Sequence, residues 1–172
     1  MEPMIKRLID REGGYSNVPG DHGGCTKYGI TLETLQQDRG RPDLSCQDLS
    51  QLSMTEAADI YQRRYLDAPG FSHVANLPLR ELLFDSAVQH DPERPVMWLQ
   101  AALGVTVDGD IGPKTLGVLG TADVLTVFAE VYRRRLGFYA QIVTHHASQL
   151  KFLEGWLNRM GNVLDACLHD DN

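Results

Sequence analysis

The chain has 172 residues, of which 42% are hydrophobic, so it is long enough to build one packed domain. Its 16 basic and 23 acidic side chains give a formal net charge of −7, which argues against binding to nucleic acid or to an anionic membrane surface. No stretch reaches the about 18 apolar residues of a membrane span, and the first residues lack the apolar block of a signal peptide. We therefore expect a protein without a membrane anchor that is made in the cytoplasm.

The cysteines and histidines point to no metal or redox chemistry. Cys25, Cys46 and Cys167 are odd in number and form no CxxC pair, so neither a disulfide framework nor a zinc knuckle is indicated, and we expect reduced thiols. The histidines lack the spacing of HExxH or of a Cys-His site. No metal and no cofactor are expected.

Helical spacing of apolar residues dominates the chain. The first such pattern ends at Gly13, which places Glu12 in the last turn of a helix or just beyond it. Further helices are predicted after Thr31, after the capping box that Ser53 opens, and over residues 77–90, 96–103, 113–119, 122–143 and 150–164. Residues 105–107 are compatible with a short strand. The sequence thus predicts one mainly α-helical domain over 1–172, with little or no β-sheet.

A glycine-rich loop, EGGYSNVPGDHGGCTKYGIT (residues 12–31), follows the first helix and carries two acids and a hydroxyl. Two carboxylates beside a cleft are what acid-catalysed cleavage of a glycosidic bond needs. Glu12 faces the negative end of a helix dipole, which suits a general acid. Asp21 lies in a polar turn that favours its ionised form, and Thr26 can hold a water or a sugar oxygen. On spacing alone, Glu12 and Asp21 also fit an ordinary helix-end acid and an Asx-turn residue.

The same residues resemble a family. The loop is similar to the signature of the glycoside hydrolase family 108 N-acetylmuramidases, which are phage and bacterial lysozyme-like proteins. The resemblance continues in FDSAVQHDPERPVMWLQAALG, VDGDIGPKT and GWLNR, so it covers nearly the whole chain. It implies a lysozyme-like helical fold with a catalytic lobe over 1–92 and a helical lobe over 93–172 that is similar to a peptidoglycan-binding segment.

The resemblance also implies an activity and its residues. The expected reaction is hydrolysis of the β-1,4 bond between N-acetylmuramic acid and N-acetylglucosamine in peptidoglycan. Glu12 matches the catalytic acid, while Asp21 and Thr26 resemble the other members of a Glu, Asp, Thr triad. The protein would be a phage endolysin, a monomer that lies in the host cytoplasm before lysis and reaches the cell wall or periplasm through a holin.

Other residues have both a structural and a functional interpretation. Tyr15 and Tyr28 flank the acidic loop, where they can pack or bind sugar. Asp85 and His90 lie on the helix predicted over 77–90, where Asp85 either contacts substrate or pairs with a backbone or arginine partner. Trp98 and Trp156 have the helical spacing of core residues. The arginine runs 63–64 and 133–135 are interpreted as solvated helix faces.

Three alternatives stay open. Cys25 with His22, His73 or His90 could form a cysteine peptidase pair, or Cys25 could be a small buried thiol. A lone catalytic glutamate without a useful second acid would suit a lytic transglycosylase. A protein without activity could bind peptidoglycan or assist secretion, as some members of the resembled family have been labelled.

Overall fold

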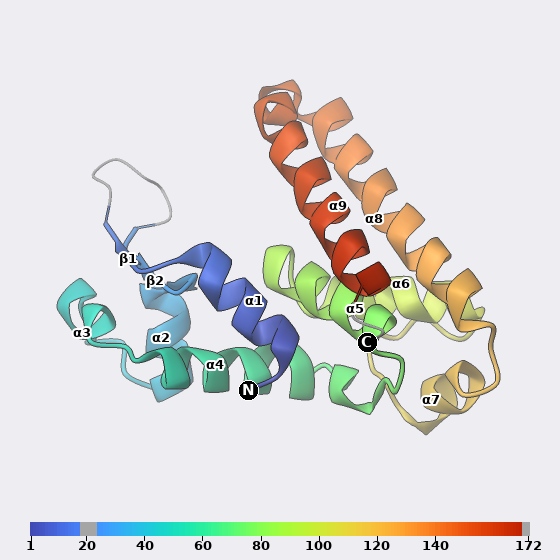
Figure 1. The fold of residues 1–172 in the computed structure, drawn as a ribbon, viewed down its shortest axis with the longest axis horizontal. Coiled ribbons are helices and arrows are strands. Elements are labelled where there is room, and N and C mark those ends of the chain that lie inside the picture. The colour runs from blue at the N-terminus through green and yellow to red at the C-terminus, as the bar shows by residue number, and fades with distance from the viewer. Residues whose placement is uncertain (18–23, 170–172) are drawn as a thin grey trace. The chain divides into compact units, whose positions relative to one another are not determined.

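The structure is a computed structural model that describes residues 1–17 and 24–169. By their internal contacts the residues form two compact units, Met1–Arg64 and a second unit from Tyr65 onward (Figure 1). The prediction of a mainly α-helical fold is confirmed, since helices make up most of both units and the only sheet among the described residues has three two-residue strands.

The first unit packs four helices around a small sheet. Its elements are α1 (Pro3–Glu12), β1 (Tyr15–Ser16), β2 (Thr26–Lys27), β3 (Ile30–Thr31), α2 (Leu32–Arg39), α3 (Cys46–Ser50) and α4 (Met54–Tyr61). The strands are antiparallel in the order β1-β2-β3. α1 contacts α4, while α2 and α3 contact the sheet. The core of this unit is apolar and includes Met4, Ile5, Leu8, Ile9, Ile30, Leu35, Leu49, Leu52, Ala57 and Ile60.

Local sequence explains where these helices begin and end. α1 buries one stripe of apolar residues at helical spacing and ends at Gly13, whose φ of +75° an L-residue rarely adopts. The predicted capping box before α4 is confirmed: the Ser53 hydroxyl accepts from the Glu56 amide, and Glu56 accepts from the Ser53 amide. Ser45 caps α3 in the same way through Asp48. α3 was not expected from the sequence.

A disulfide joins Cys25, directly before β2, to Cys46, the first residue of α3. The expectation of reduced thiols is therefore wrong for these two cysteines, whereas Cys167 is buried and lies outside the disulfide. The two partners are 21 residues apart in sequence and meet because α2 and α3 fold back onto the sheet. The Lys27 ammonium group also donates to the Ser50 carbonyl, which adds a second link between β2 and α3.

The second unit is helical throughout its regular structure. A π-helical segment, η1 (Gln62–Asp67), leads into it, followed by η2 (Phe71–His73), α5 (Leu77–Gln89), α6 (Glu93–Leu103), α7 (Pro113–Leu119), α8 (Val124–His145), η3 (Ala147–Phe152) and α9 (Leu153–His169). α5 packs against α6, α8 and α9, and α8 and α9 form an antiparallel pair (Figure 1). Asn76 caps α5, because its side chain accepts from the Leu79 amide.

Residues 105–107 form no strand, contrary to the sequence expectation. The buried side-chain amide of Gln100 fixes the loop residues that follow this segment, 108–110. It accepts from the backbone amides of Asp108 and Gly109 and donates to the Asp108 carboxylate and the Asp110 carbonyl. Because the backbone groups of 108–110 bond to one side chain, no sheet ladder is needed to satisfy them.

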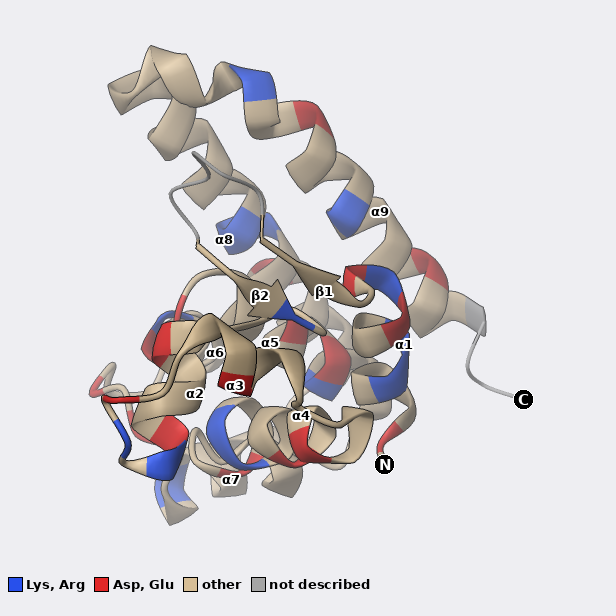
Figure 2. Ribbon diagram, turned by 90° about the vertical axis from the view of Figure 1, so that its left-hand side faces the viewer, with Lys and Arg blue, Asp and Glu red and all other residues tan. Residues whose placement is uncertain are grey.

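The surface carries mixed charge. Figure 2 shows acidic and basic residues interspersed along α1 and α9, and on α1 Lys6 pairs with Asp10 one turn away. Within residues 1–17 and 24–169, no single helix is long and apolar enough to cross a membrane; α7 and α8 pass that test only as a pair, bent by 116°.

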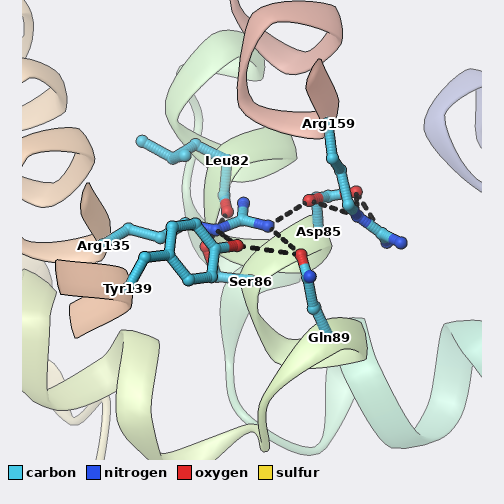
Figure 3. Close-up of polar contacts among 7 residues, drawn as sticks. All are labelled: Leu82, Asp85, Ser86, Gln89, Arg135, Tyr139 and Arg159. Carbon is cyan, nitrogen blue, oxygen red and sulfur yellow. Dashed lines mark hydrogen bonds and ion pairs between the residues drawn. The ribbon is translucent and has the colours of Figure 1, made fainter. Parts of the chain in front are cut away.

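A buried charge cluster lies where α5, α8 and α9 meet (Figure 3). Asp85 is 5% exposed and its carboxylate accepts from Arg135 at 2.7 Å and from Arg159 at 3.0 Å. Arg135 also donates to Gln89 and to the Tyr139 hydroxyl. Burial alone would raise the pKa of Asp85, but the two guanidinium groups outweigh it and hold the pKa below its ordinary value.

The solvated face expected for the arginine run 133–135 is wrong for Arg135, which is 0% exposed. Successive helical residues point about 100° apart, so three in a row cannot share one face. Arg135 falls on the buried stripe of α8 with Val131 and Tyr139, one turn away on either side. Arg133 remains exposed and pairs with Glu130.

Breaking the disulfide should destabilise the protein. Cys25→Ser should lower the free energy of unfolding by about 3 kcal/mol, because an open loop of this length gains conformational entropy in the unfolded chain. Urea unfolding in oxidising buffer measures this, with Cys167→Ser as the control that keeps the disulfide. Cys46→Ser should match Cys25→Ser, and the double variant should lose nothing more. A wild-type curve that does not respond to reductant would contradict the prediction.

Removing the charge of Asp85 should also destabilise the protein. Asp85→Asn should cost about 3–5 kcal/mol at neutral pH, because it leaves buried guanidinium groups without their counter-charge. Since the folded pKa lies below the unfolded value of about 3.9, this contribution is present above about pH 4 and is lost as the pH falls further. Urea unfolding at several pH values checks this. Glu130→Gln, on the surface of α8, is the matched control, and equal stability of the two variants would refute the prediction.

Candidate functional site

Glu12 is the last residue of α1, as the sequence predicted. The helix is fixed by its buried apolar stripe, and its end is fixed by the Gly13 amide, which donates to the Ile9 carbonyl. The Glu12 side chain is exposed. Glu12 thus lies on a rigid element and keeps solvent-exposed surface, two features that suit a general acid.

Thr26 lies on the central strand of the small sheet. It pairs with Ser16 of β1 and with Thr31 of β3, and its side chain is half-buried. β1 begins three residues after Glu12, so the sheet that carries Thr26 is joined to the end of α1 by a very short connection (Figure 2). The second predicted acid, Asp21, lies outside the described residues.

The connection between β2 and β3 is a two-residue turn, Tyr28–Gly29. Both residues have a positive φ, +53° and +77°, as a type I′ hairpin turn requires. The Tyr28 amide donates to the Gly13 carbonyl at 3.1 Å, and the Tyr28 carbonyl accepts from the Tyr61 hydroxyl at 3.0 Å. The turn is thus fastened to the residue after Glu12 and to the end of α4.

This turn lies against the Glu12 side chain. A Cβ atom placed on Gly29 would be 2.9 Å from Glu12 Cγ and would overlap the Tyr61 hydroxyl oxygen. Only glycine therefore fits between the two side chains. The sequence did not single out Tyr61, because a tyrosine in the apolar pattern of a helix gives no sign that its hydroxyl supports a turn.

Tyr15 and Tyr28 both belong to this part of the first unit. Tyr15 lies in β1 and is 43% exposed. Tyr28 is half-buried, and the Lys27 ammonium group lies 5.5 Å from the centre of its ring. Both rings therefore retain surface near the end of α1, where an aromatic face can stack on a sugar ring.

Cys25 is not available as a nucleophile in this structure. Its sulfur is bonded to Cys46 and the residue is 2% exposed. A cysteine peptidase needs a free thiolate beside a base. The disulfide removes that thiolate, so the cysteine peptidase interpretation is not supported. Across the described residues, no group of three or more His, Cys, Asp or Glu side chains could hold a metal ion.

Asp85 and His90 lie in the second unit, where packing accounts for both. Asp85 belongs to the buried cluster with Arg135 and Arg159. His90 caps the end of α5, and its ring makes edge contacts with Trp98 and Phe138. Burial, and then the charge of Arg135, lowers the pKa of His90 to about 4, so its ring is neutral at neutral pH. Their substrate contacts stay a prediction.

Comparisons with known proteins agree with these features. Residues 5–90 match the family model of glycosyl hydrolase 108, and residues 94–161 match that of a predicted peptidoglycan domain. The border between the two matches falls inside the second compact unit, so the families and the units divide the chain at different points. A comparison with curated proteins found no match.

Among solved structures, the chain is similar to that of SagA from Brucella abortus. The TM-score is 0.82 and the sequences are 30% identical, over 95% of this chain and 91% of that chain. The first family model spans half of the sequence and contains most of α1, the sheet and α4. The chain therefore belongs to the glycosyl hydrolase 108 family and has its lysozyme-like, mainly α-helical fold.

Proposed function

We propose that the protein is an N-acetylmuramidase that hydrolyses the β-1,4 bond between N-acetylmuramic acid and N-acetylglucosamine, with Glu12 as the general acid. The two family matches support the coarser statement, a glycoside hydrolase that acts on peptidoglycan. The observation that carries the finer one is the position of Glu12, an exposed carboxyl group at the end of a rigid helix with the Tyr28–Gly29 turn packed against it.

In this mechanism Glu12 gives its proton to the glycosidic oxygen as the bond to the sugar breaks. Asp21 is the proposed second carboxylate. It either activates a water on the far face of the sugar, or stabilises or captures the glycosyl cation. A carboxyl separation of about 5–5.5 Å would give retention and one of about 6.5–9.5 Å would give inversion.

Three further side chains have proposed roles in the same unit. The Thr26 hydroxyl would hold a water or a sugar oxygen, and the rings of Tyr15 and Tyr28 would stack on sugars. Contacts of Asp85 and His90 with the glycan, phage origin, and release to the wall through a holin remain predictions.

The alternatives differ in their products. A lytic transglycosylase ends the cut chain in an anhydro sugar that is one water lighter than the hydrolysis product. A protein that only binds peptidoglycan would sediment with purified sacculi and release nothing soluble. An exposed Glu12 on a fixed helix end favours an enzyme over a binding protein, because binding does not need a group that transfers a proton.

Glu12→Gln keeps the shape of the side chain and removes its transferable proton. Release of soluble muropeptides from purified peptidoglycan should fall at least about 100-fold, the usual contribution of a general acid. Mass spectrometry of the products measures both the rate and the type of chain end, and wild type should give reducing muramic-acid ends.

Glu33→Gln is the matched control, since Glu33 is exposed on α2 of the same unit. It should cut at the wild-type rate, and both variants should unfold at the wild-type temperature. Full activity of Glu12→Gln would refute the role of Glu12, while anhydro ends from wild type would replace the hydrolase with a transglycosylase.

A further inference from the structure

The backbone of Tyr28 is in a conformation that side chains resist. With a φ of +53°, it is the one non-glycine among the described residues that lies in the left-handed region. This region brings Cβ close to the following carbonyl oxygen, so a bulky residue adopts it only where surrounding contacts fix it there. The contacts that hold the peptide groups of Tyr28 are therefore required to keep its backbone in this conformation.

Two hydrogen bonds hold this residue, one from each side. On the side of α1, the Tyr28 amide donates to the Gly13 carbonyl. On the side of α4, the Tyr28 carbonyl accepts from the hydroxyl of Tyr61, whose side chain is 2% exposed. Little water can reach this buried position to replace the hydroxyl as a donor. Loss of the Tyr61 hydroxyl would therefore leave the Tyr28 carbonyl without this hydrogen bond, and the turn could relax.

The Tyr28–Gly29 turn limits the conformations that the Glu12 side chain can adopt. Gly29 is close enough to Glu12 that an added Cβ would meet both Cγ and Cβ of the glutamate, at 2.9 and 3.2 Å. The same added atom would overlap the Tyr61 hydroxyl oxygen. The stem of the proposed acid and the buried tyrosine hydroxyl thus both lie on the face of Gly29 where a side chain would be, so the turn borders the space that Glu12 can occupy.

We propose that Tyr61 is a positioning residue for Glu12. Its hydroxyl holds the Tyr28–Gly29 turn in its left-handed form, and the turn restricts the rotamer of Glu12. Tyr61 acts through this turn and not on substrate, so it is not a catalytic residue. The inference rests on the proposed function only for its effect on rate, since the restriction of Glu12 is a property of the fold.

Tyr61→Phe removes the hydroxyl and keeps the buried ring. Because a small misplacement of a reacting group is costly, kcat should fall about 10-fold while KM stays near the wild-type value. Tyr132→Phe, which removes a hydroxyl from a half-buried ring on α8, is the matched control and should leave both constants unchanged. An unaltered kcat for Tyr61→Phe would overturn the proposal.

A double-variant cycle tests whether Tyr61 and Gly29 act through the same contact. Gly29→Ala places a methyl group against Glu12 and against the Tyr61 hydroxyl, so kcat should fall at least about 100-fold. Adding Tyr61→Phe removes one of those overlaps, so the double variant should be more active than Gly29→Ala alone. If the two substitutions acted independently, the double variant would be the least active of the three variants, and that result would contradict the account.

A second readout does not need activity. In wild type, three-bond NMR couplings of Glu12 should show one dominant side-chain rotamer, and Tyr61→Phe should average them. Unchanged couplings, together with unchanged amide shifts of Gly13 and Gly29, would overturn the positioning role whatever the reaction is. If Glu12→Gln stays fully active while the couplings respond to Tyr61→Phe, the proposed function fails and the positioning of residue 12 stands.

Discussion

A two-residue turn with left-handed backbone, Tyr28–Gly29, determines the arrangement of the first unit around Glu12. A type I′ hairpin turn needs positive φ at both central positions, and here one of them is a tyrosine. Hydrogen bonds to Gly13 and from Tyr61 satisfy the Tyr28 peptide groups and connect the turn to α1 and to α4. Because residue 29 is glycine and has no side chain, the turn can lie directly against the proposed acid.

The disulfide and the small sheet extend this arrangement. Cys25 precedes the strand that carries Thr26, and its bond to Cys46 fastens that strand to α3. The sheet itself is too short to be stable alone, since two-residue strands bury little surface. The disulfide and the side-chain hydrogen bonds therefore stabilise this sheet, whereas larger sheets are stabilised by the length of their strands.

The two units use carboxylates in opposite ways. Glu12 lies on a helix end and is exposed to solvent. Asp85 is buried between two arginines, so its charge is committed to holding α5, α8 and α9 together. An acid among apolar neighbours on a helix can either contact a substrate or form a buried ion pair. Here the positions of Arg135 and Arg159, which are distant in sequence, identify the ion pair. This is why sequence alone left Asp85 open.

Local signals predicted much of the fold, and contacts distant in sequence account for what was missed. The end of α1 at Gly13, the cap at Ser53 and the helix 113–119 follow from short motifs and are confirmed. The pairing of Cys25 with Cys46 and the burial of Arg135 depend on how helices fold back, which no local pattern encodes. Of the candidate site, Glu12 and Thr26 could be proposed from the family signature, whereas the support from Tyr61 required the structure.

The central claim is that Glu12 protonates the glycosidic oxygen. A crystal structure of Glu12→Gln bound to a tetrasaccharide of alternating N-acetylglucosamine and N-acetylmuramic acid tests it most directly. The account predicts that the residue 12 amide lies within about 3 Å of the oxygen that joins muramic acid to the next glucosamine. A glycan bound with that oxygen out of reach of residue 12, and beside another carboxyl group, would contradict it.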